Sequence, residues 1–109
     1  MSSFEQAFGE LKSGLTSLIT TTLKKRSEAA LEAGKDYLET LKDDLRTWSG
    51  QVAKGELSLE DVRWLVNSKK DLAEMILLKE KGLSLVAVDQ FKNQLSQLLI
   101  GTVTKGLGI

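Results

Sequence analysis

Four acidic side chains between positions 36 and 44 have the type and spacing that could bind a divalent cation: Asp36, Glu39, Asp43 and Asp44. Carboxylate oxygens are the ligands that Mg²⁺ and Ca²⁺ prefer. Three basic residues alternate with them at helical spacing: Lys35, Lys42 and Arg46. Since opposite charges three or four residues apart pair along a helix, we interpret this stretch as a solvated, salt-bridged helix face and not as a metal site.

Cysteine and histidine are both absent from the sequence. The chain therefore has no thiolate nucleophile and no zinc–sulfur site, and it lacks the usual general base near neutral pH. No GxGxxG, Walker, HExxH or EF-hand pattern occurs either. We expect a protein that is not an enzyme and that needs no metal and no cofactor.

The charges are balanced, with 15 basic and 15 acidic residues. The single basic run, Lys24-Lys25-Arg26, is followed at once by Glu28 and Glu32. Binding to a nucleic-acid backbone needs more cations along one face. We therefore expect no nucleic-acid partner, and we interpret the run as a solvated helix turn.

Apolar residues recur at helical spacing along the first half of the chain, and proline is absent throughout. The pattern predicts one long first helix over about residues 3–48. Its apolar positions are Phe4, Phe8, Leu11, Leu15, Leu18, Thr22, Leu31, Gly34, Leu38, Leu41, Leu45 and Trp48. The seam changes phase after Thr22, which leaves open a break near Lys24–Ser27, although neither glycine nor proline marks one. Gly50 is placed as the residue that follows the helix.

Two further helices are predicted to return along the first, over about residues 58–81 and 84–105. Ser58 and Ser84 are suited to cap their starts. If the chain folds as a hairpin, residues whose numbers sum to about 106 lie opposite each other, and this rule gives five apolar pairs. They are Leu45–Val62, Leu41–Leu65, Leu15–Phe91, Leu11–Leu95 and Phe8–Leu98.

The sequence therefore predicts an all-α fold, a single domain over residues 1–109 built as an antiparallel helical hairpin or bundle. A hairpin with one long helix has too few layers to cover its own core, so we expect two copies to complete a four-helix bundle. A chain that breaks near Ser27 would instead close a four-helix bundle by itself. We favour the continuous helix and the homodimer.

The charges are unevenly distributed, because residues 24–82 hold 24 of the 30. A hairpin brings the two charge-poor ends together, which predicts an apolar interaction face at one end of the molecule. We assign nine residues to this interaction face: Phe4, Phe8, Leu11, Leu15, Leu18, Phe91, Leu95, Leu98 and Leu99. Trp48 and Trp64 flank the connection between the halves, and we expect both to close the tip of the hairpin.

The function that fits these features is a non-enzymatic structural or interaction protein that self-associates through amphipathic helices, with a partner protein helix as a further possible ligand. The alternative is a peripheral protein that coats a lipid or polymer surface with those helices. The modest hydrophobicity of the first helix and the lack of a basic rim disfavour membrane association. We expect a cytoplasmic location, because the first residues lack the basic start of a signal peptide.

Overall fold

The computed structural model of this chain describes residues 3–70, 73–77 and 82–105. These residues form five helices: α1 (Ser3–Leu23), α2 (Glu28–Ala53), α3 (Leu59–Lys70), α4 (Glu74–Leu77) and α5 (Leu85–Lys105). The same residues contain no strand. The prediction of an all-α fold is confirmed for them.

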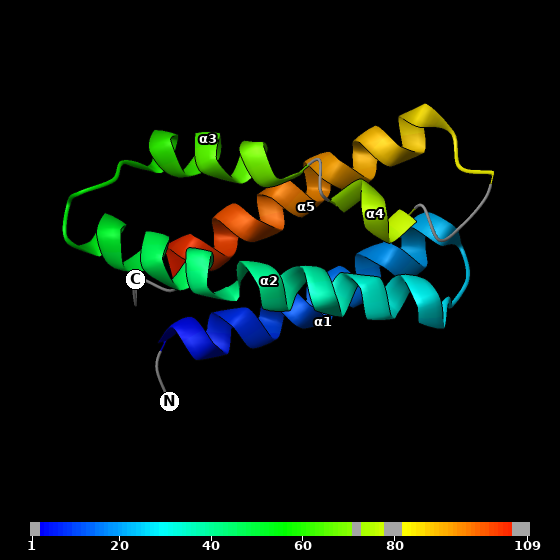
Figure 1. Cartoon of the computed structure of the whole chain (residues 1–109), viewed down its shortest axis with the longest axis horizontal. Helices are drawn as coiled ribbons and strands as arrows, with labels where there is room; N and C mark the ends of the chain where they lie inside the picture. Colours follow the sequence, from blue (N-terminus) through cyan, green and yellow to red (C-terminus); the bar gives the residue numbers. More distant parts are fainter. Residues whose placement is uncertain (1–2, 71–72, 78–81, 106–109) are drawn as a thin grey trace.

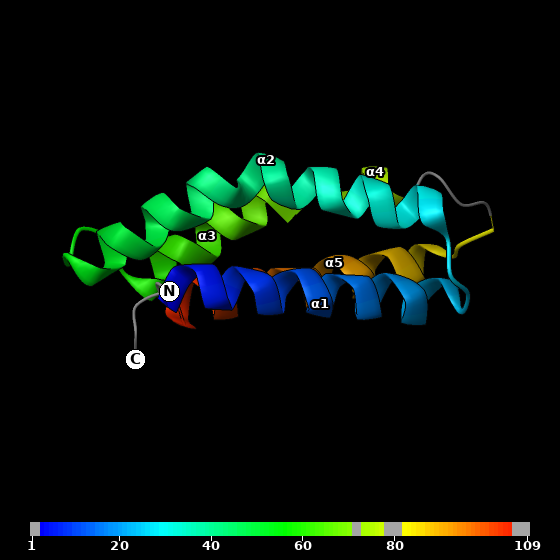
Figure 2. The ribbon, with the colours of Figure 1, turned by 90° about the horizontal axis from the view of Figure 1, so that it is seen from below.

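The helices pack in two layers (Figures 1 and 2). α1 and α5 lie side by side and antiparallel in one layer, and α2 lies with α3 and α4 in the other. The arrangement is a bundle 44 Å long in which α3 and α4 together take the place of one helix. The α1–α2 turn and the start of α5 lie at one end of the bundle, which we call the hinge end.

The first helix is not continuous. α1 ends at Leu23 and α2 begins at Glu28, so the prediction of one helix over residues 3–48 is wrong, and the alternative break near Lys24–Ser27 is correct. Lys24 takes a left-handed backbone conformation with φ of 58°. This conformation costs a residue with a side chain about 1–2 kcal/mol, which is why glycine usually occupies such positions. Ser27 then starts α2, since its hydroxyl accepts a hydrogen bond from the Ala30 amide at 3.2 Å.

The other helix boundaries follow their capping residues. Ser58 and Asp61 exchange hydrogen bonds of 3.0 and 3.1 Å at the start of α3. Ser84 accepts one of 3.1 Å from Ala87 at the start of α5. Both predicted caps are confirmed. α2, however, continues through Gly50 to Ala53, and Gly55, with φ of 78°, lies in the turn that follows. The predicted helix over 58–81 is found as two elements, α3 and α4, while residues 71–72 and 78–81 lie outside the described part.

Aliphatic and aromatic side chains from all five helices form one core. Its largest fully buried members are Leu15, Ile19, Leu38, Leu41, Leu45, Val62, Val66, Ile76, Phe91, Leu95, Leu99 and Val103. Ile19 occupies the core position that we expected for Leu18, which is only half-buried. The buried Ser49 and Tyr37 hydroxyls donate to backbone carbonyls of Val103 and Lys69 at 3.2 and 3.1 Å. The bundle is thus filled by side chains of a single chain.

The register between α1 and α5 differs from the hairpin rule. Leu98 lies beside Gly14, where an added Cβ atom would be 3.3 Å from its Cδ2 atom, and Lys105 pairs with Glu10. The residue numbers in each of these pairs sum to more than 106. The hairpin rule fails here because α1 folds back at its own turn, so the α2–α3 connection no longer fixes its position. Between α2 and α3 the rule holds, since the residue numbers of the hydrogen-bonded Tyr37 and Lys69 sum to 106.

Gly34 allows α1 and α2 to approach closely. A Cβ atom at this position would lie 2.8 Å from the Cδ1 atom of Ile19 and 3.4 Å from the Cδ2 atom of Leu15. Gly9, by contrast, has nothing within 4 Å of its notional Cβ atom and is exposed. The two helical glycines therefore form a matched pair for testing the α1–α2 contact.

We predict opposite effects for Gly34→Ala and Gly9→Ala. Gly9→Ala should raise the free energy of unfolding by about 0.5–1 kcal/mol, because alanine has the better helix propensity. Gly34→Ala should lower it, since overpacking a core costs about 1–3 kcal/mol and outweighs that gain. Urea denaturation followed by circular dichroism measures both. Equal stabilisation by the two substitutions would contradict the close contact of α1 with α2.

Candidate functional site

The nine residues predicted as an interaction face lie inside the bundle. Seven of them are at most 6% exposed: Phe4, Phe8, Leu11, Leu15, Phe91, Leu95 and Leu99. Leu18 and Leu98 are half-buried at the edge of the core. Because α1 folds back at residues 24–27, the apolar sides of α1 and α5 meet α2, α3 and α4 of the same chain. In this arrangement seven of the nine residues are covered without a second chain, and Leu18 and Leu98 are partly covered.

The two charge-poor segments, α1 and α5, form one layer of the bundle, whereas we expected them to form one end of it. α1 and α5 run beside each other over their length, so their few charges are spread along one side of the bundle. Exposed positions in this layer are largely uncharged: Gln6, Gly9, Ser13, Thr16, Ser17, Thr21, Gln90, Asn93, Gln94 and Gln97. The expectation of one bare end followed from the continuous first helix and is corrected together with it.

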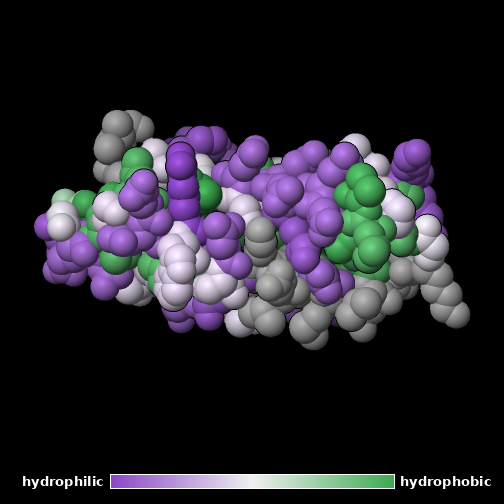
Figure 3. Space-filling model, turned by 90° about the horizontal axis from the view of Figure 1, so that it is seen from above, coloured by the Kyte–Doolittle hydropathy of each residue, from purple (hydrophilic) through white to green (hydrophobic). Residues whose placement is uncertain are grey.

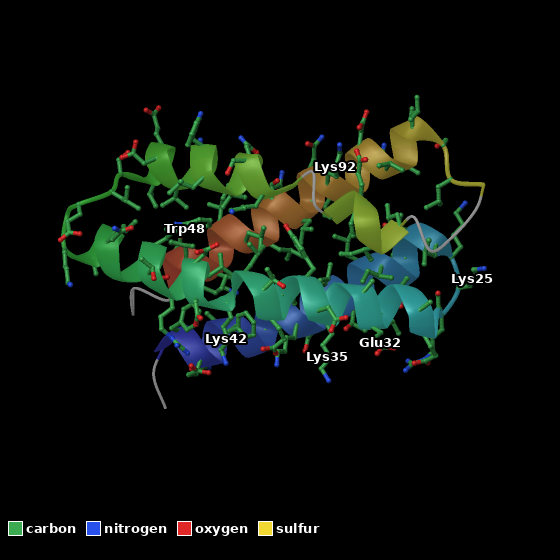
Figure 4. All side chains as sticks on the ribbon, in the orientation of Figure 1. Lys25, Glu32, Lys35, Lys42, Trp48 and Lys92 are labelled. Atoms are coloured by element: carbon green, nitrogen blue, oxygen red, sulfur yellow. The ribbon has the colours of Figure 1, made fainter. Side chains whose placement is uncertain are left out.

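Most charges that α1 and α5 do carry pair with another helix. Glu10 of α1 lies 2.9 Å from Lys105 of α5, and Lys12 lies 3.5 Å from Glu39 of α2. Lys92 of α5, labelled in Figure 4, lies 2.6 Å from Glu74 of α4. Each of these pairs connects two different helices, and Glu10–Lys105 connects the first helix to the last, so they fix how the helices are aligned.

The densest group of polar contacts joins the first half of α1 to α2. Glu5 lies 2.7 Å from Arg46 and 3.7 Å from Lys42, which reaches from α2 toward α1 in Figure 4. Phe8 has Lys42 5.1 Å from its ring centre, and Phe4 has Arg46 at 5.3 Å. Cations above aromatic faces and beside a carboxylate are favourably placed. The cations of this group are engaged by the chain's own groups, so we interpret it as a clamp between α1 and α2.

A groove of about 500 Å³ lies between α1 and the first half of α2. Its floor includes Leu15, Ile19 and Leu38, which are already almost fully buried. Its rim has three cations and three carboxylates: Lys12, Arg26, Lys35, Glu28, Glu32 and Asp36. Glu32 and Lys35 are labelled on α2 in Figure 4. Because the charges of the rim cancel and the apolar residues below it are already buried, the groove favours no particular class of ligand.

Large apolar side chains are exposed at two other places. Leu85 and Val86, in the first turn of α5, are 84% and 65% exposed. Figure 3 shows a hydrophobic patch toward the hinge end among hydrophilic residues. Leu59 and Trp64 of α3 are exposed as well. Trp48 of α2, labelled in Figure 4, is buried, whereas Trp64 is 71% exposed, so the expectation that Trp64 closes the tip is wrong.

The sequence contained a signal for the exposed pair that we did not use. Leu85 and Val86 are consecutive apolar residues that follow the Ser84 cap and precede the first position that we predicted to face inward. Our predicted inward positions began only at Val88, which is half-buried. The exposed pair is the candidate functional site, because it is the described surface at which two adjacent aliphatic side chains remain in water.

Comparison with known proteins gives no match to a family model, to a curated protein or to a solved structure. Among the described residues, no helix combines the length and the hydropathy of a membrane span. No three acidic residues in this part of the chain are grouped as they would be around a metal ion. Function therefore has to be argued from the chain's own surface.

We predict a small acid sensitivity that depends on Glu5. The hydrogen bond from Arg46 lowers the pKa of Glu5 below its usual value of 4.5. A carboxylate with a lowered pKa stabilises the fold above the unfolded-state pKa, and that contribution disappears as the pH falls through the folded-state pKa. Glu5→Gln should therefore lower the melting temperature slightly at neutral pH and leave a smaller further loss below pH 4.5 than the parent shows. Parallel acid-melting curves in the two proteins would contradict the clamp.

Proposed function

We propose that this chain is a non-enzymatic structural protein that assembles with a second copy of itself through the hinge end of its bundle. The supporting observation is the exposure of Leu85 and Val86 next to each other at the start of α5. A single exposed leucine is ordinary on a protein surface. Two adjacent aliphatic side chains that keep most of their area in water are typical of a contact surface.

A second copy is the partner that this surface fits best. In a twofold symmetric dimer the same patch meets itself, so the exposed aliphatic side chains of one copy cover those of the other. Half-buried Leu23 and Leu83 belong to the same end of the bundle and extend the apolar area. The balanced net charge of the chain places no overall repulsion between copies.

We predict that Leu85→Glu combined with Val86→Glu abolishes self-association. Two carboxylates on each side of the twofold axis would repel each other and would resist removal from water. Sedimentation equilibrium from micromolar to submillimolar concentration should give twice the chain mass of 12.0 kDa for the parent and the single mass for the variant.

Leu59→Glu is the matched control, because Leu59 is an exposed leucine in the first turn of α3. That turn lies at the end of the bundle opposite the hinge. The control should dimerise like the parent. A parent that stays monomeric at every concentration would refute the proposal, and loss of the dimer in both variants would refute the assignment to the hinge end.

The alternative function, a coat on a lipid or polymer surface, is favoured by the largely uncharged outer side of the α1–α5 layer. The apolar sides of these helices are already buried in the bundle, so coating would require the bundle to open. We therefore predict that the protein does not float with vesicles of neutral or anionic phospholipid. Flotation accompanied by dissociation of the dimer would favour the coat over self-assembly.

A further inference from the structure

The turn between α1 and α2 is short and strained. Residues 24–27 form the whole connection, and they include no glycine. Among the residues described, Lys24 is the one non-glycine with a positive φ, at 58°. Short connections under strain favour exchange of an element between copies, because straightening the connection relieves the strain.

The sequence around this turn also suits an uninterrupted helix. Straightening residues 24–27 would join α1 and α2 into one helix over 3–53, about 75 Å long at 1.5 Å per residue. The turn contains neither proline nor glycine, and Lys24 and Glu28 would lie one helical turn apart in a favourable pair. The local sequence therefore supports both a closed turn and a straight helix.

A chain with a straightened turn cannot remain alone. α1 packs against α2 and α5, and its inner residues Phe8, Leu11 and Leu15 are 2% exposed. In an open chain these side chains and the facing side of α5 would both be in water, at a large cost in free energy. Two open chains can each insert α1 into the site that the other has vacated.

We infer that two copies of this chain associate by exchanging α1 about the hinge at Lys24–Ser27. The inference rests on the proposed self-association and specifies its structure. The predicted interaction residues of α1, including Phe4, Phe8, Leu11 and Leu15, then contact α5 of the other copy.

The position of the hinge explains the exposed apolar pair. The α1–α2 turn, from which Lys25 projects in Figure 4, lies at the same end of the bundle as the start of α5. A straightened helix leaves the bundle at this end, so the two copies meet there, and Leu85 and Val86 fall in the new contact. Two antiparallel helices that cross near Arg26 also bring Lys24 of one copy opposite Glu28 of the other, which offsets the basic run.

A mixed crosslink distinguishes exchange from any other dimer. Glu10 and Lys105 are 2.9 Å apart, exposed, and remote from the hinge end. Because the chain has no cysteine, Glu10→Cys in one preparation and Lys105→Cys in a second place one reactive thiol in each. The two preparations are unfolded together, refolded at submillimolar concentration, and treated with a short bis-maleimide after the dimer has been isolated.

Exchange predicts efficient crosslinking between the two different chains in the mixed dimer. Each single-thiol preparation alone should crosslink poorly, and a chain with both substitutions should crosslink within itself when it is folded as a dilute monomer. A mixed dimer that forms without the crosslink would overturn the exchange and leave the self-association standing. Absence of any dimer would overturn both.

The hinge itself provides a second test with opposite variants. Lys24→Gly relieves the closed turn and disfavours the straight helix in both chains, so the dimer should weaken by roughly 100-fold. Ser27→Ala removes a cap that only the closed chain needs, so the dimer should strengthen by about tenfold. Sedimentation equilibrium measures both shifts. Dimer affinities that change in the same direction, or not at all, would overturn the hinge assignment.

Discussion

The reversal of the chain at Lys24–Ser27 is the constraint on which the rest of this structure depends. It turns one long amphipathic pattern into two antiparallel helices, and it lets the apolar side of α1 face α2 and α5 of the same chain. The left-handed backbone of Lys24 opposes the turn, while the Ser27 cap and the Arg26–Glu28 ion pair at 2.6 Å favour it. The Ser27 cap and the solvent-exposed Arg26–Glu28 ion pair each stabilise the fold by about 1 kcal/mol or less. The core that the turn allows to form therefore contributes far more to the closed bundle than these two contacts do.

The buried side chains and the ion pairs of α1 and α5 contribute differently to the structure. α1 and α5 supply half of the largest fully buried side chains, and their few charges mainly pair with residues of other helices, as in Glu10–Lys105 and Lys92–Glu74. Exposed ion pairs contribute little to stability. Their effect is on alignment, since Glu10 can meet Lys105 in one register of α1 against α5. The outer side of this layer is largely uncharged because α1 and α5 together carry six charged residues.

The helical fold could be predicted from the sequence because each helix carries an apolar period and most starts carry a capping residue. Ser58 and Ser84 were recognised in this way. The break after Leu23 was harder to assign, because it is encoded by a cap at Ser27 and a basic triplet and not by glycine or proline. The α1–α5 register was missed for a related reason, since it is set by contacts such as Gly14 with Leu98 that depend on the fold. The exposure of Leu85 and Val86 depends on where the first turn of α5 ends relative to the other helices, which a helical period does not specify.

The closed bundle and the exchanged dimer that we propose would contain nearly the same contacts, joined by different connections. In both, the apolar side of α1 would pack against α5, and the two states would differ only in which chain supplies α1. The large free energy of core burial therefore cancels when the two are compared, and the remaining difference comes from the hinge residues, the contact at the hinge end and the entropy of joining two chains. Terms of about 1–2 kcal/mol at Lys24 are decisive in such a balance, although they are small beside the core. In the exchanged dimer that we propose, assembly would depend on the concentration of the chain, and single substitutions at the turn would set the concentration at which it occurs.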